Sequence, residues 1–140
     1  MSGSGSIFSK IIAREIPATI VFENERIIAF ADIAPEAPVH LLVVPKIETY
    51  ANVTELAAGD PALLAEVVSV AARLAAEHAV GDYKLVFNTG ASAGQTIFHV
   101  HAHVLAGELG LAGASDTAGE LGLADASGAA GEPGEGSRGN

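Results

Sequence analysis

Residues 98–107 read FHVHAHVLAG and place three histidines, His99, His101 and His103, on alternate positions. Side chains alternate between the two sides of a strand, so these three imidazoles are predicted to face one way. The apolar residues between them, Val100 and Ala102 among them, then face a core. The stretch therefore predicts a strand over 97–105 with a polar stripe on one side and a packed reverse side.

Three interpretations of this stripe are open. The first is a zinc site, but positions 99 and 103 lie about 13 Å apart on a strand, so one ion would use two of the histidines at most, together with His40 or a carboxylate. The second is nucleophilic catalysis by the middle imidazole, with phosphate donors from the adjoining Gly94-Gln95-Thr96 segment. The third is a solvated or purely structural histidine stripe.

The rest of the chain predicts an α+β domain over 7–106, with a five-stranded antiparallel sheet, one long helix and a short N-terminal helix. Apolar residues at helical spacing predict the short helix over 7–14. Asp60 as a cap and Pro61 at the first position begin the long helix, which ends before Gly81. Runs rich in β-branched and apolar residues predict the remaining strands. These strands cover 19–23, 26–31, 39–45 and 83–88.

The composition limits the classes of function. The chain has 140 residues, a net charge of −10, seven Lys and Arg residues and no cysteine. Polymer nucleic acid is therefore not an expected partner, and disulfides and thiolate metal sites are excluded. No apolar run approaches the roughly 20 residues of a membrane helix, and the start of the chain lacks a secretory signal pattern. We expect a cytoplasmic protein.

The two ends of the chain differ from the domain. Residues 1–6 (MSGSGS) are expected to be a flexible lead. Residues 107–140 hold ten of the sixteen glycines and repeat GELGLAGASDTA as GELGLADASGAA. Two such copies are too short to bury a core of their own. This acidic, Gly- and Ala-rich low-complexity tail is expected to be disordered.

HVHAHVL at 99–105 matches the pattern of the histidine triad (HIT) family, and the likeness extends beyond this motif. IFSKIIAREIPATIVFENERIIAFADIAPEAPVHLLVVPK at 7–46 and NTGASAGQTIFHVHAHVLAG at 88–107 resemble the nucleotide-binding branch of that family. The resemblance implies a hydrolase for nucleoside phosphoramidates and related nucleoside monophosphate conjugates, with purine nucleotides preferred. It implies no metal or other cofactor, and it implies a homodimer.

The resemblance also implies roles for single residues. His101 matches the nucleophile that becomes transiently nucleotidylated, and His99 and His40 match supporting histidines. His103 and Thr96 match phosphate contacts in the same loop as Gly94 and Gln95. At the nucleoside end, Asp32 matches the carboxylate that binds ribose hydroxyls, Ile33 lines the base pocket, and Asn88 lies at the sugar–phosphate site. On residue types alone, Asp32 and Asn88 fit ordinary turn chemistry equally well.

Two departures from the family pattern bear on function. Ser6-Ile-Phe-Ser9 stands where many members have Cys-x-x-Cys for a structural zinc, which would leave His40 and His99 as two orphaned ligands. The repetitive tail replaces a segment that reaches the partner subunit in many members. A regulatory nucleotide-binding module with little turnover is the second functional hypothesis, and a metalloenzyme is the third. Leu63, Val67, Val70 and Leu74 fit either a dimer contact or a helix covering its own sheet.

Overall fold

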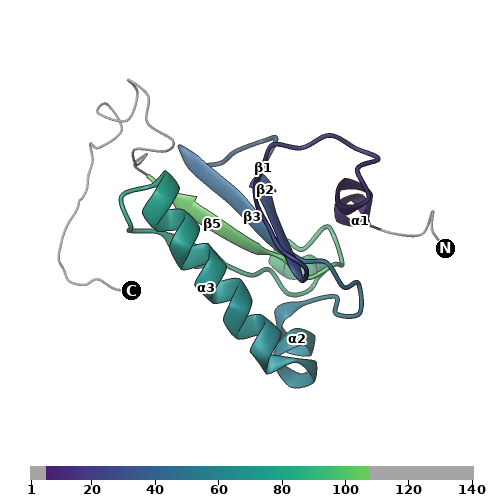
Figure 1. The fold of residues 1–140 in the computed structure, drawn as a ribbon. Coiled ribbons are helices and arrows are strands. Elements are labelled where there is room, and N and C mark those ends of the chain that lie inside the picture. Colours follow the sequence, from purple (N-terminus) through teal and green to yellow (C-terminus); the bar gives the residue numbers. More distant parts are fainter. Residues whose placement is uncertain (1–5, 108–140) are drawn as a thin grey trace.

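A computed structural model of the chain describes residues 6–107, so the predictions for the N-terminal lead up to residue 5 and for the tail from residue 108 lie outside the described residues. Within this range the predicted five-stranded antiparallel sheet is confirmed, with the strand order β1-β2-β3-β5-β4 (Figure 1). In chain order the elements are α1 (Ile7–Ile12), β1 (Ile20–Glu23), β2 (Ile27–Ala31), β3 (Val39–Pro45), α2 (Val53–Gly59), α3 (Pro61–His78), β4 (Lys84–Val86), the 3₁₀ turn η2 (Ala91–Ala93) and β5 (Ala102–Ala106).

The long helix α3 begins where the sequence predicts. Asp60 is its N-cap, and the Asp60 side chain accepts a hydrogen bond from the backbone N–H of Leu63. The apolar stripe on α3, for which the sequence left a dimer contact and the covering of the chain's own sheet as alternatives, is buried against that sheet, with exposed fractions of 8% or less. The stripe is therefore explained by the covering of this sheet (Figure 1).

The strands β2 and β3 are buried on both faces of the sheet. Ile27, Ala29, Leu41 and Val43 pack in the cluster under α3, and the residues between them pack with Phe8 and Ile11 of α1. A strand covered on both sides reads as a continuous apolar run, as VHLLVV does in β3. The two helices therefore lie on opposite faces of the sheet, and α1 lies on the face away from α3.

The predicted bounds are wrong at three places. The last strand begins at Ala102 and not at residue 97, because the backbone before it bonds outside the sheet: the Val100 N–H donates to the Tyr50 carbonyl. The first helix stops at Ile12, since Arg14 takes a left-handed conformation with φ of 66°. The helix α2 is missing from the sequence-based description, and β4 is shorter than predicted, at three residues.

The alternation across the histidine stretch is confirmed even where no strand exists. Val100, Ala102 and Val104 are buried in the cluster under α3. On the opposite face the rings of His99 and His101 contact Phe8 of α1. None of the helices within residues 6–107 is long and apolar enough to cross a membrane.

Candidate active site

The structure brings three of the predicted histidines into one row. The ring centroids of His101 and His103 lie 5.0 Å apart, and those of His103 and His40 lie 5.2 Å apart. His40 on β3 reaches His103 on β5 because Leu42, two residues from His40 on the same face, is the register partner of His103. Asp32, which follows β2, completes the row, with its Oδ2 atom 3.4 Å from His40 Nε2.

His101 is held in one tautomer. Its Nδ1 lies 2.8 Å from the backbone oxygen of His99. A carbonyl oxygen only accepts hydrogen bonds, so Nδ1 carries the proton and Nε2 keeps its lone pair. Among the described residues, no hydrogen bond to Nε2 is present. Burial lowers the pKa of His101, and it outweighs the hydrogen bond to His99, which favours the charged form.

His101 is more enclosed than the open stripe predicted from the sequence, with 9% of its surface exposed. Phe8 of α1 packs edge-on against the imidazole at a centroid distance of 4.8 Å. Apolar contact on one side and the backbone oxygen of His99 on another fix the direction of the ring. The result is a neutral imidazole with one unpaired nitrogen, which is the form that attacks an electrophile.

His99 is not part of the row, although the sequence places it in register with the other two. Its Nε2–H donates to the Pro45 carbonyl at 2.7 Å, and its Nδ1 accepts from the Ser6 hydroxyl at 2.8 Å. Only 2% of His99 is exposed, and burial lowers its pKa. With both nitrogens satisfied, His99 supports the backbone whose carbonyl orients His101.

His40 and His99, which the sequence leaves as two orphaned ligands of a missing zinc site, both have hydrogen-bond partners within the protein. His99 bonds to Ser6 and Pro45, whereas His40 bonds to Glu36 and His103. The Ser6 hydroxyl therefore occupies the Nδ1 atom of His99. Serine also caps α1, because the Ser6 oxygen accepts from the Ser9 N–H.

A second group of possible ligands, Asp32, His40 and His103, has its ligand atoms within 4.8 Å of one another. The spacing suits a small cation, but the protonation pattern does not. The backbone N–H of Glu36 donates to His40 Nδ1 at 3.0 Å, so a neutral His40 carries its proton on Nε2, the atom that would face the metal. Metal ligation needs a lone pair at that atom. The donor set therefore disfavours a metal.

The loop after β4 holds its own shape with most of its polar groups. Gly90 and Gly94 both take φ of 94°, a conformation that favours glycine. The backbone N–H groups of Gly94 and Gln95 donate to carbonyls inside the loop, and the Asn88 side chain donates to the Ala93 carbonyl. These predicted phosphate donors are thus already used. Thr96, which is exposed, keeps its hydroxyl and N–H without a partner among the described residues.

Gln95 is buried, with 3% of its surface exposed, and all its polar atoms are engaged. Its oxygen accepts from the Gly90 N–H at 2.9 Å. Its nitrogen donates to the carbonyls of Ala51 at 2.6 Å and Ile97 at 3.0 Å. In this arrangement the side chain of Gln95 shapes the loop and fastens it to the segment before α2.

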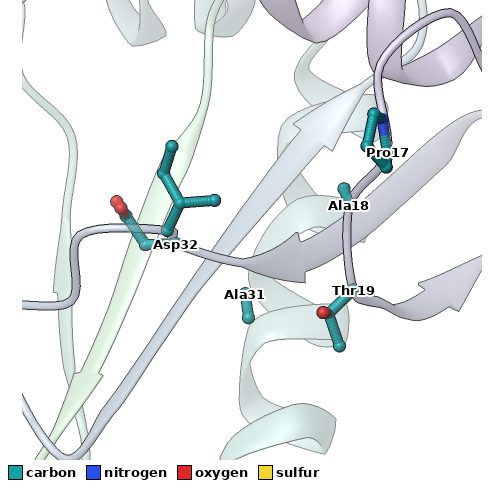
Figure 2. A pocket seen from close by; sticks show the side chains of 6 residues that line it. Pro17, Ala18, Thr19, Ala31 and Asp32 are labelled. Carbon is teal, nitrogen blue, oxygen red and sulfur yellow. The ribbon is translucent and has the colours of Figure 1, made fainter.

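A surface pocket of about 340 Å³ lies beside Asp32. Pro17, Ala18 and Thr19 line one side, and Ala31 and Asp32 line the other (Figure 2). Ile33 also lines it and is 91% exposed, which is unusual for an isoleucine. An exposed apolar side chain next to a carboxylate offers a surface for a ligand with one flat apolar part and one hydroxylated part.

The chain is similar to several known proteins. A family model for the HIT domain matches residues 13–109. The chain is 47% identical over 103 residues to an uncharacterized HIT-like protein of Synechococcus elongatus, covering 73% of this chain and 90% of the relative. It is 39% identical over 104 residues to the purine nucleoside phosphoramidase of Escherichia coli K12, covering 73% and 87%. A HIT family hydrolase from Clostridium thermocellum superposes with a TM-score of 0.69 at 43% identity, covering 74% and 91%.

Proposed function

The chain belongs to the histidine triad family, and from this membership we propose that it is a purine nucleotide-binding hydrolase that cleaves nucleoside phosphoramidates or related nucleoside monophosphate conjugates. The observation that carries the proposal is the tautomer of His101, whose proton is held on Nδ1 by the His99 carbonyl while Nε2 stays free. The name of the Escherichia coli relative supports the substrate class.

The chemistry has two steps. In the first, the lone pair of His101 Nε2 forms a bond to the α-phosphorus, the phosphorus–nitrogen bond breaks, and its electron pair goes to the leaving nitrogen, which takes up a proton. In the second, water attacks the phosphorus, loses a proton and returns the electron pair to Nε2. The products are an amine and a nucleoside monophosphate, and the protein is restored without a metal or other cofactor.

The neighbours of His101 suit the remaining parts of this substrate. His103 lies beside the nucleophile and would donate to a phosphate oxygen, as would the free hydroxyl of Thr96. The carboxylate of Asp32 would accept from ribose hydroxyls, and the exposed Ile33 would contact the base. Gly94, Gln95 and Asn88 act in this proposal by shaping the phosphate loop.

The test is to mix the protein with an adenosine phosphoramidate and to look for a nucleotidyl adduct by intact mass spectrometry. We expect a transient adduct and turnover, both absent in His101→Ala. His78→Ala is the matched control, because His78 ends α3 on the other face of the sheet. Adduct or turnover in His101→Ala at the wild-type level would refute the role of His101.

The same experiment separates the alternative. A regulatory or scaffold module would bind adenosine monophosphate without adduct or turnover. The feature that favours this alternative is the burial of His101, which packs against Phe8 and has 9% of its surface exposed. We also propose that the chain works as a homodimer in the cytoplasm. Light scattering after size-exclusion chromatography tests the homodimer.

A further inference from the structure

The hydrogen bonds around His40 fix more than its own proton. The Glu36 backbone N–H donates to His40 Nδ1 at 3.0 Å, and a backbone amide cannot exchange its donor role for an acceptor role. A neutral imidazole has one N–H, so His40 carries it on Nε2. The Nε2 atom of His40 lies 3.0 Å from His103 Nδ1 and 3.4 Å from Asp32 Oδ2, so its proton lies between these two acceptors.

The proton on His40 Nε2 also determines which nitrogen of His103 is protonated. Its Nδ1 faces a donor, His40 Nε2–H, so it must accept and must hold a lone pair. The proton of a neutral His103 is then on Nε2. A backbone N–H in the turn after β2 thus selects the tautomer of a histidine on β5 through one intervening imidazole.

We propose that His103 is a neutral hydrogen-bond donor whose proton is fixed on Nε2 by the series Glu36 N–H, His40, His103, and that it keeps this proton throughout the reaction. The backbone N–H of Glu36 and the ring of His40 act as positioning groups for that donor. The catalytic part of this proposal rests on the proposed function, whereas the tautomer is a property of the free protein.

A second proton on His103 has no place in this arrangement. It would sit on Nδ1 and face His40 Nε2–H at 3.0 Å. If the His40 proton moved to Nδ1 instead, it would face the Glu36 N–H, whose nitrogen lies 3.0 Å from His40 Nδ1, and two donors would again oppose each other. A histidine that acts as a general acid carries protons on both ring nitrogens first and becomes neutral when it gives one of them to the leaving group. Because His103 has no place for a second proton, this hydrogen-bond pattern opposes that role.

The charges around His103 act in both directions. Burial lowers the pKa of His103, a positive charge on His40 would lower it further, and the carboxylates of Asp32 and Glu36 raise it. The net shift is downward, in agreement with a neutral ring at pH 7. The groups that surround the His103 ring come from every adjoining element. They are Asp32 after β2, Glu36 in the following turn, His40 on β3, His101 before β5, and the apolar Val86, which is the register partner of His103 on β4. The cation on β4, Lys84, pairs in register with Leu105 and is exposed.

The proton balance of the reaction follows from this assignment. When the phosphorus–nitrogen bond breaks, the leaving nitrogen takes its proton from water, and the attacking water of the second step returns one proton to the solvent. His103 Nε2–H contributes a hydrogen bond to a phosphate oxygen in both steps. Its contribution is electrostatic and does not change its own protonation state.

The deciding experiment is nitrogen NMR of protein labelled with ¹⁵N-histidine, which distinguishes a protonated ring nitrogen from one with a lone pair. We expect His40 and His103 each to be neutral with the proton on Nε2, in the free protein and with bound adenosine monophosphate. A His103 that carries its proton on Nδ1, or protons on both nitrogens at about pH 7, would overturn the proposal.

Two variants of His40 test the positioning role. His40→Gln keeps an acceptor for the Glu36 N–H and a donor toward His103, whereas His40→Phe keeps the ring shape and loses both. In His40→Phe we expect His103 to become a mixture of its two neutral tautomers, and in His40→Gln the Nε2–H form to be restored. A His103 tautomer that is unchanged in His40→Phe would refute the series, since misfolding would be visible in the rest of the spectrum.

Kinetics test the claim that the proton is kept. The ratio of kcat/KM for an adenosine phosphoramidate to that for an adenosine p-nitrophenyl phosphate, whose leaving group needs no proton, is followed with pH. We expect no break in this ratio from about pH 5 to about pH 9. A ratio that is level in acid and falls tenfold per pH unit above a break below 6.5, the ordinary pKa of histidine, would show that His103 gives up its proton. Lack of turnover in the wild type would refute the proposed function and leave the NMR result to decide the tautomer.

Discussion

The substitution Gln95→Glu changes one atom in the loop after β4 and reverses a hydrogen-bond pattern. The wild-type nitrogen donates to the carbonyls of Ala51 and Ile97, at 2.6 Å and 3.0 Å. In the variant a carboxylate oxygen takes the place of that nitrogen and faces two oxygens that only accept. The hydrogen bond from the Gly90 N–H to the other oxygen is preserved, so the size and the third contact stay constant.

The magnitude follows from the two lost bonds. Each buried acceptor left without a donor costs about 1–3 kcal/mol, and both carbonyls belong to half-buried residues, which favours the lower end. We expect the free energy of unfolding to fall by about 2 kcal/mol at about pH 8. Burial and the facing carbonyls raise the pKa of the introduced carboxyl, so the folded state binds the extra proton more tightly. The loss should therefore shrink as the pH falls toward about 5, where the protonated carboxyl again donates.

The assay is urea denaturation of the wild type, Gln95→Glu and Ser92→Ala at about pH 5 and about pH 8. Ser92 is the matched control, because it is exposed in the same loop. Its variant should stay within about 0.5 kcal/mol of the wild type at both pH values. If Gln95→Glu is as stable as the wild type at about pH 8, or loses more stability in acid than in base, Gln95 does not fasten the loop as described.

Three further changes have expected outcomes. Lowering the pH from about 7 to about 5 should lower the free energy of unfolding, because burial lowers the pKa values of His99 and His101 and the unfolded state takes up protons first. In urea denaturation, His99→Leu should show a smaller fall in the free energy of unfolding over this range. Ser6→Ala should lower the free energy of unfolding by about 1–2 kcal/mol in thermal melts, since it removes both the cap of α1 and the donor to His99, and an unchanged melting temperature would contradict the Ser6–His99 bond. Leu74→Ala should cost about 3 kcal/mol in urea, against less than about 1 kcal/mol for Val68→Ala on the exposed side of α3; equal losses would mean that α3 covers the sheet with another face.

The sequence predicts the fold well where the pattern of side chains reflects burial. The alternation from His99 to Val104 holds over its whole length, although only residues from Ala102 onward pair with other strands. Alternation reports which side of an extended backbone is buried, and it does not report hydrogen-bond partners. The strand was therefore predicted too long, because the Val100 N–H bonds to a segment fifty residues away in sequence.

The helix α2 shows a different limit. VTELAAG has only seven residues, of which the last three are small, so no helical period stands out. Its start is nevertheless marked by a cap, since the Asn52 side chain accepts from the Glu55 N–H and the Glu55 carboxylate accepts from the Ala51 N–H. A search for Asn followed three residues later by Glu would have found this helix.

Some residues of the candidate site could be predicted from the sequence, and others could not. Motif spacing identified His101 and His103, but it could not show that His99 faces Ser6 and Pro45, because that contact joins residues far apart in the chain. The pairing of His40 with His103 spans 63 residues and depends on the register of β3 and β5. The role of the Glu36 N–H was beyond any pattern of side chains, because the backbone of every residue except proline carries the same group.

The charges of the described residues bear on the proposed neutral donor at His103. Arg14 and Lys46 pair with Glu23, and Arg26 pairs with Asp60 and Glu66, so these three cations are already engaged elsewhere. The carboxylate of Asp32 lies with its oxygen within 4.8 Å of ring nitrogens of His40 and His103, and it would repel a phosphate bound beside them. An imidazole that presents an N–H without becoming charged would donate to that phosphate at neutral pH, whereas a charged ring would have to be stabilised in a buried position. In the proposed mechanism, the fixed tautomers of His40 and His103 would be the means by which this chain presents a neutral donor to a phosphate.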